Sequence, residues 1–299
     1  MSLLNLTNDG LPNVLMVLFA AVAKARTPLS REELLELVAP PQVVPEDGKM
    51  ARQTLTRWTE LGLFKAEGER IVLAESPESD FRDDNELLES VRKAARKCAL
   101  APENNVDLWA SESARAADLT RAMSWLLAQD VYRFKFKGIE DMALEQLSGS
   151  GLSLVQNDTR YNGLRFWAHF LGFVRQPGAD DIDPTVAVRD SLSLCLPPGD
   201  GMAADLFVDR LCEVLPVLDR GTWRVAVENR LNPGSLQPLA KDQLSSSLSR
   251  ALLNLMLSQE ILLEQRADMG SGIALTGRDG LRADYRFQWV RRPGGRRSK

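Results

Sequence analysis

One predicted helix, at residues 49–61, limits the fold more than any other segment. Its apolar side chains recur every three or four residues and so share one helical face; they are Ala51, Leu55, Trp58 and Leu61. Gly62 follows at once, as is common at a helix end. Residues 63–65 and 70–73 then flank a turn at 67–69 and predict a short hairpin. A helix that leads directly into a hairpin needs further helices to cover its apolar face.

Two such helices are predicted ahead of it. Residues 11–25 are largely apolar, with Pro12 in the first turn. The second helix starts after Ser30, which forms a capping box with Glu33. The order helix, helix, helix, hairpin and the segment 55–64 resemble the recognition helix and first wing strand of a winged helix-turn-helix domain. We therefore expect an N-terminal winged helix-turn-helix domain at residues 1–75.

A similar order is predicted near the C-terminus. Helices are expected at residues 203–215 and 241–259, with a segment broken by prolines between them. Residues 261–266 and 273–276 flank a glycine-containing turn and predict a wing-like hairpin, and residues 285–290 alternate as another strand. We expect a winged-helix-like domain at 200–290 and a flexible basic tail at 291–299.

The middle of the chain, residues 76–199, is predicted to be a helical domain that could itself be winged-helix-like. It holds 14 basic and 19 acidic residues, against 8 and 10 in residues 1–75 and 15 and 12 in residues 200–299. The C-terminal part is therefore the least unfavourable to nucleic acid on charge grounds. The expected fold class is mainly α with small β-hairpin wings, as tandem winged-helix modules flanking a helical middle domain.

The few cysteines and the single histidine argue against a zinc site, a disulfide framework or a catalytic cysteine or histidine. Cys98, Cys195 and Cys212 are far apart without a CxxC pair, so we expect reduced, partly buried thiols. The single histidine, His169, lies in an aromatic helical segment and is expected to be packed. A carboxylate-only magnesium site at residues 180–183 is an alternative to a loop that caps the next helix. Phosphate-binding loops are absent from the sequence, so we expect no cofactor, no metal and no enzymatic activity.

The first candidate surface is the face of the 49–61 helix opposite its apolar stripe. Its side chains are of the types that contact phosphates and base edges in a major groove; the candidates are Lys49, Arg52, Gln53 and Thr56, with Arg57 at the flank. An ordinary solvated face has the same composition. Glu60, Glu67 and Glu69 repel phosphate and would weaken binding.

Two further surfaces are predicted in the C-terminal part. The tail supplies cations for salt-dependent phosphate contacts, namely Arg291, Arg292, Arg296, Arg297 and Lys299, or is a plain solvated terminus. The 241–259 helix carries apolar residues outside its main face, which predicts burial on two sides; these are Leu253, Met256 and Leu257. Either the middle domain or a partner protein would cover them.

Three short phrases carry a resemblance to a known family. They are the leader at residues 1–5, the Val-Ala-Pro-Pro sequence at 38–41 and the aromatic segment at 167–173. Together they look like DpdG-type proteins, which are encoded in bacterial deazaguanine DNA-modification and phage-defence clusters. The resemblance implies a non-catalytic accessory component that acts beside DNA-handling ATPases or nucleases, and it transfers no catalytic residues.

We therefore expect a non-catalytic winged-helix adaptor or DNA-binding component of a bacterial multi-protein DNA-processing or phage-defence complex. Its partners would be other protein subunits and double-stranded DNA, the latter bound weakly and in a salt-sensitive manner. No apolar run reaches the ~20 residues of a membrane helix, and no signal peptide is recognised, so a cytoplasmic protein without membrane contact is expected. A dimeric winged-helix transcription regulator is the alternative, which leaves a homodimer open.

Overall fold

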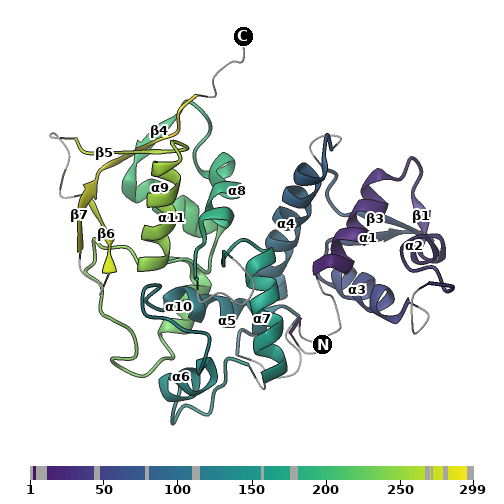
Figure 1. Cartoon of the computed structure of the whole chain (residues 1–299), viewed down its shortest axis with the longest axis horizontal. Coiled ribbons are helices and arrows are strands. Elements are labelled where there is room, and N and C mark those ends of the chain that lie inside the picture. The colour runs from purple at the N-terminus through teal and green to yellow at the C-terminus, as the bar shows by residue number, and fades with distance from the viewer. Residues whose placement is uncertain are drawn as a thin grey trace. The chain divides into compact units, whose positions relative to one another are not determined.

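The computed structural model describes residues 3–4, 12–43, 48–77, 81–109, 115–155, 158–175, 181–266, 270, 272–278 and 282–294. These residues form a mainly helical protein with small antiparallel sheets (Figure 1). The chain divides into two compact units: unit 1 comprises residues 1–120 and 155–171, and unit 2 comprises 121–154 and 172–299. The three predicted domains remain a prediction, and the predicted middle domain contributes to both units.

The N-terminal part of unit 1 has the predicted order plus one short strand. Its elements are α1 (Pro12–Lys24), β1 (Leu29–Ser30), α2 (Arg31–Val38), α3 (Lys49–Glu60), β2 (Phe64–Glu67) and β3 (Arg70–Leu73). The strands form an antiparallel sheet in the order β1-β3-β2. The predicted capping box is present, because the Ser30 hydroxyl accepts from Glu33 N at 3.1 Å and the Glu33 carboxylate accepts from Ser30 N at 2.7 Å. Gly62, at φ 87°, ends the α3 segment as predicted.

Three further helices belong wholly or partly to unit 1. They are α4 (Asp84–Leu100), α7 (Asp158–Phe170) and the start of α5 (Ala117–Ala128), with the short 3₁₀ helix η2 (Pro102–Asn104) after α4. Trp58 of α3 is fully buried, and its ring lies 5.4 Å from that of Trp167 on α7. The predicted packing of His169 is wrong: this residue is exposed, because Trp167 and Phe170 turn the buried face of α7 away from it.

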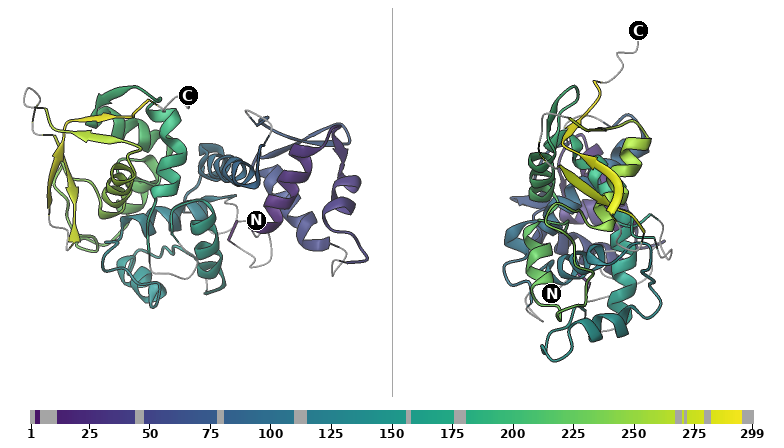
Figure 2. Two further views of the ribbon diagram at one scale, coloured as in Figure 1. Left: turned by 45° about the horizontal axis from the view of Figure 1, so that its top comes forward. Right: turned by 90° about the vertical axis from the view of Figure 1, so that its left-hand side faces the viewer.

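Unit 2 combines helices with five short strands among its described residues. Besides the rest of α5 it contains α6 (Ile139–Gln146), α8 (Thr185–Cys195), β4 (Gly201–Ala203), α9 (Ala204–Val214), α10 (Thr222–Glu228), α11 (Ser246–Leu257), β5 (Leu262–Glu264), β6 (Ile273–Thr276), β7 (Arg282–Phe287) and β8 (Trp289–Arg291). The strands lie along one side of α8, α9 and α11 (Figures 1 and 2). They form one sheet in the order β4-β8-β5 and a separate β6-β7 pair.

Two predictions in this unit are wrong. The hairpin predicted from residues 261–266 and 273–276 does not form, because β5 pairs with β8 and β6 pairs with β7. Both strands bury apolar residues, and burial selects partners distant in sequence over the nearby turn. The helix predicted at 241–259 starts only at Ser246, since the Ser245 hydroxyl caps it by accepting from Leu248 N at 3.2 Å.

The element order of unit 2 repeats that of unit 1. The series α8, β4, α9, α11, β5, β8 corresponds to α1, β1, α2, α3, β2, β3, and in both sheets the last strand lies between the other two. The first helix of each series packs against the second and third. In unit 2, α10 and the β6-β7 pair are inserted into this order. The repeat therefore starts with α8, before the boundary at residue 200 that the sequence predicts.

Candidate nucleic-acid and partner-binding surfaces

The outward face of α3 brings most of its predicted residues together. Lys49, Arg52 and Thr56 are exposed and Gln53 is half-buried, whereas the apolar stripe on the other side is buried. Glu60 is also exposed on this helix and adds a negative charge near its end. The face thus presents cations and hydrogen-bonding groups in its first two turns, which is the chemistry of a groove-binding helix.

The adjacent helix adds a cation that the sequence did not indicate. Arg31, the first residue of α2, donates from its guanidinium to the Thr56 hydroxyl at 2.7 Å. That hydroxyl in turn donates to the Arg52 carbonyl at 2.9 Å. Arg31 therefore lies beside the α3 face, and the bond holds the start of α2 against the middle of α3. Only a tertiary contact could reveal this residue, because 25 positions separate it from Thr56.

Arg57 does not belong to this surface. Its residue is only 6% exposed, and Thr54 on the same side of α3 is fully buried. The buried arc of α3 is therefore wider than the apolar stripe alone suggests. Asn104 of η2 contributes to this wider coverage by donating its amide to the Leu61 carbonyl at 2.9 Å. A buried guanidinium is not available to phosphate, so the prediction for Arg57 needs correction.

The basic C-terminal residues are more ordered at their start than predicted. Arg291 belongs to β8, and its Nε donates to the Glu264 carboxylate of β5 at 2.9 Å. Arg292 is half-buried and its backbone N–H donates to the Asp200 carbonyl at 2.9 Å. The flexible tail therefore cannot begin at Arg291. Arg296, Arg297 and Lys299 lie outside the described residues.

Helix α11 is covered within unit 2. The Ser247 hydroxyl donates to the Leu127 carbonyl at 2.8 Å, and the Ser246 hydroxyl accepts from Val131 N at 3.1 Å. Arg250 forms an ion pair with Asp181 and lies over the Tyr132 ring, 5.1 Å from its centroid. These contacts are made by residues 127–181, which belong to the predicted middle domain. They agree with the first of the two covers expected for this helix, the middle domain and not a partner protein.

Of the three predicted partner-binding residues, only one is strongly exposed. Leu253 and Met256 are half-buried, whereas Leu257 at the end of α11 is 75% exposed. Residues 131–133 form a turn, in which the Asp130 carboxylate accepts from Tyr132 N at 3.0 Å. This turn supplies part of the cover over α11.

The three thiols are poor nucleophiles. Burial raises the pKa of Cys98 to about 12, of Cys195 to about 11 and of Cys212 to about 12. The thiolate is the reactive form of cysteine, so a raised pKa suppresses reactivity at neutral pH. The thiols are free and at least half-buried, as predicted.

We expect the folded protein to react slowly with a thiol reagent at pH 8. A pKa of about 11 leaves roughly one thiolate in a thousand at this pH. Three thiols should become reactive only in denaturant, which a colorimetric disulfide reagent can follow over time. Rapid labelling of one cysteine in the folded protein would contradict the pKa values.

Metal-binding geometry is not found in the part of the chain that the structure describes, where no three His, Cys, Asp or Glu side chains are grouped suitably. Asp181 pairs with Arg250. The Asp183 carboxylate accepts from Thr185 N at 3.0 Å, at the start of α8. The cap position of α8 is Pro184, which makes no side-chain cap bond, and Asp180 lies outside the described residues.

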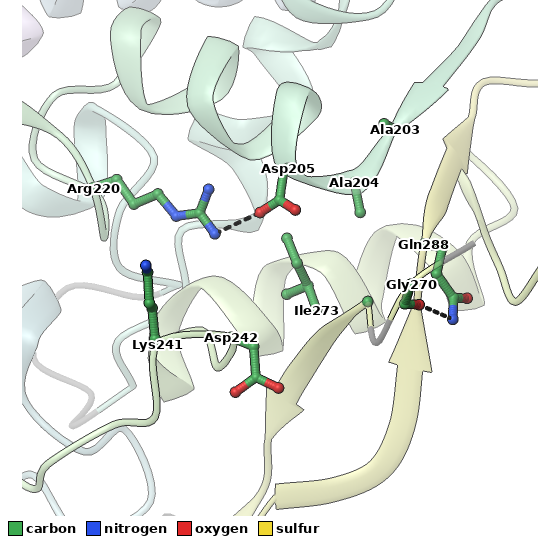
Figure 3. A pocket seen from close by; sticks show the side chains of 10 residues that line it. Ala203, Ala204, Asp205, Arg220, Lys241, Asp242, Gly270, Ile273 and Gln288 are labelled. Carbon is green, nitrogen blue, oxygen red and sulfur yellow. Dashed lines mark hydrogen bonds and ion pairs between the residues drawn. The ribbon is translucent and has the colours of Figure 1, made fainter.

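A cavity of about 700 Å³ lies in unit 2, lined by residues near β4, the start of α9 and β6 (Figure 3). Its polar side chains are largely paired with the protein. Arg220 donates to Asp205 at 2.9 Å, and Gln288 donates its amide to the Gly270 carbonyl at 3.1 Å, as Figure 3 shows. Asp242 pairs with Arg286 at 2.9 Å. These bonds involve four polar side chains of the lining, whereas most of the exposed lining is apolar.

Comparison with known proteins gives one assignment. A family model described as DpdG-like matches residues 1–269. No curated protein and no solved structure matches the chain. None of the helices in the described ranges is long and apolar enough to cross a membrane.

Proposed function

Because the chain belongs to the DpdG-like family and is thus a component of a deazaguanine DNA-modification system, we propose that it acts there as a non-catalytic adaptor. It contacts double-stranded DNA through the outward face of α3 and other protein subunits through unit 2. Both units are winged-helix modules in this proposal. The chain performs no chemistry itself and holds DNA and partner subunits together.

The observation that carries this proposal is the repeated element order with two unlike third helices. A helix, strand, helix, helix and hairpin, with the first strand paired to the last, is the order expected of a winged helix. In unit 1 the third helix, α3, exposes Lys49 and Arg52. In unit 2 the third helix, α11, is covered by the chain itself and ends in an exposed leucine. One module therefore suits a DNA groove, and the other suits protein packing.

The charge of the protein supports weak DNA contact. The formal net charge is −4, so the field of the whole chain repels a phosphate backbone and binding must come from local cations. Glu67 and Glu69 are exposed in the β2-β3 hairpin, where a wing would approach phosphates. An adaptor tolerates such weakness, because other subunits of a complex supply additional contacts.

Purification of the tagged protein from its native host tests the proposal. An adaptor should be recovered with other subunits in constant stoichiometry, and the assembly should bind duplex DNA more tightly than the chain alone. Recovery as a lone homodimer that binds one operator with high specificity would instead support the dimeric transcription regulator, which places two recognition helices about one DNA turn apart. Mass measurement and duplex binding distinguish the two results.

A further inference from the structure

The outer face of the β4-β8-β5 sheet carries two arginines, Arg291 on β8 and Arg266 just after β5. Val290 and Leu263 point to the buried side of this sheet, with exposed fractions of 0% and 6%. Since side chains alternate along a strand, Trp289 and Arg291 of β8 and Glu264 of β5 lie on the opposite, outer face. The sheet thus separates a buried apolar layer from a charged outer layer.

Trp289 contacts both β4 and Arg266 on this outer face. Its indole lies close over β4, because a Cβ placed on Gly201 would come within 2.5 Å of the indole Nε1. The guanidinium of Arg266 stacks on the same ring, 3.8 Å from its centroid. Stacking on tryptophan stabilises an arginine and fixes the plane of its donors. Glycine at position 201 is therefore required by the approach of the indole.

Glu264 lies between the two arginines of this outer face. Glu264 accepts from Arg291 Nε at 2.9 Å and from Arg266 at 3.2 Å. These hydrogen bonds, that from Arg291 foremost, lower the pKa of Glu264. The carboxylate therefore stays ionised at neutral pH, and the Arg266–Arg291–Glu264 group carries one net positive charge.

A second glutamate lies just before β5. Glu260 accepts a forked pair of hydrogen bonds from Arg189, at 2.7 and 2.8 Å from Nε and Nη2. Burial acts to raise its pKa, but the bonds from Arg189 and Ser258 and the charge of Arg292 outweigh it and lower the pKa. Asp183 and Asp190 also act on Arg189, and the Arg292 side chain donates to the Leu196 carbonyl just after α8. This second group therefore adds no positive charge to the outer face.

We propose that this surface, formed by Arg266 and Arg291 around Glu264 and called the arginine face below, binds the phosphate backbone of duplex DNA without reading sequence. The inference rests on the proposed function in DNA handling and adds a second, folded contact in unit 2. The guanidiniums of Arg266 and Arg291 each have five donors, and Glu264 accepts a hydrogen bond from one donor of each. Those that remain on Arg291 and Arg266 match phosphate oxygens in charge and planar geometry.

Three observations favour DNA as the occupant. Arginine, rather than lysine, suits bidentate phosphate contacts. Trp289 is held between Gly201 and Arg266 and so is not presented for stacking on an unpaired base, which disfavours single strands. The sequence beyond Arg292 contains three further cations and no acid.

Duplex binding by the full chain at several salt concentrations tests the arginine face. The slope of log affinity against log salt is negative, and removal of one phosphate contact reduces its magnitude by about 0.9. We expect R266Q/R291Q to reduce this magnitude by about 1.8 for its two arginines, and E264Q to bind more tightly than wild type because it removes a negative charge. The matched control is R210Q/R220Q, which removes two exposed arginines elsewhere in unit 2 and should change the slope less.

The opposite signs of the two effects keep the test decisive even if one variant folds poorly. An unchanged salt slope for R266Q/R291Q, with no gain in affinity for E264Q, overturns the proposal. The proposal also fails if R266Q/R291Q loses a partner subunit while its DNA binding stays intact, because the surface would then bind protein. If an α3 variant weakens DNA binding while R266Q/R291Q leaves both the affinity and the salt slope unchanged, only the arginine face fails and the proposed function stands. Absence of duplex binding by wild type at any salt overturns the arginine face and the DNA contact of α3 together.

Discussion

Trp58→Ala should cost unit 1 on the order of 3–5 kcal/mol of unfolding free energy, the range for removal of a large buried aromatic side chain. Trp58 is fully buried and packs on Trp167, with ring centroids 5.4 Å apart and planes inclined by 43°. It joins α3 to α7, so its removal leaves a cavity between two helices. Such a change is a large part of the total stability of an ordinary domain. Urea unfolding followed by circular dichroism measures it.

Trp58→Phe and Val17→Ala provide the controls. Phenylalanine keeps an aromatic ring in the site, and the buried Trp58 Nε1 has no hydrogen-bond partner to lose, so Trp58→Phe should cost clearly less than the alanine change. Val17 on α1 is 51% exposed, and its truncation should have little effect. Unchanged stability of Trp58→Ala, together with loss of nucleic-acid binding, would show that α3 is oriented differently.

The sequence predicted unit 1 best, because its signals are local. The capping box at Ser30, the apolar stripe of α3 and Gly62 act over three to five residues, and each is found in the structure. The strand β1 was missed because two residues are too few to show alternation. Its pairing with β3 depends on a partner some 40 positions away. Local patterns cannot specify such a partner.

Unit 2 shows the same division between local and distant interactions. Strands were recognised at residues 261–266, 273–276 and 285–290, but their partners were not. Leu263 pairs with Val290 across the sheet, and Ile273 with Phe287. All four side chains are buried, with exposed fractions of 6% or less. Core packing therefore selected these partners, and a glycine-rich turn signal alone predicted a different hairpin.

The candidate surfaces follow the same rule. Periodicity predicted which side of α3 faces outward, yet it could not show that Arg57 is covered or that Arg31 reaches Thr56. The contact of Arg266 with Trp289 joins segments 23 positions apart and carries no sequence motif. Residue type and spacing thus predict the composition of a surface, whereas tertiary contacts determine which of its charges can reach a ligand.

Reversal of two charges on α3 should produce the largest change in DNA binding. K49E/R52E exchanges two cations for two anions on the exposed face, so it removes up to two phosphate contacts and adds repulsion. We expect the magnitude of the negative slope of log affinity against log salt to decrease by about 1.8, and binding to vanish first at the higher salt concentrations. Fluorescence anisotropy with a labelled duplex at several salt concentrations measures both.

A matched reversal separates a local contact from the effect of net charge. K24E/R26E alters the net charge by the same amount at exposed positions at the end of α1, and it should weaken binding far less if α3 enters the groove. Equal weakening by both pairs would mean that only the overall charge acts.

In R52A/Q53A, a changed preference between duplex sequences would show that the helix reads bases, because side chains that contact only phosphates carry no sequence information. Without wild-type binding even at low salt, the α3 face would instead be a protein-contact surface, and the adaptor would reach DNA only through its partners.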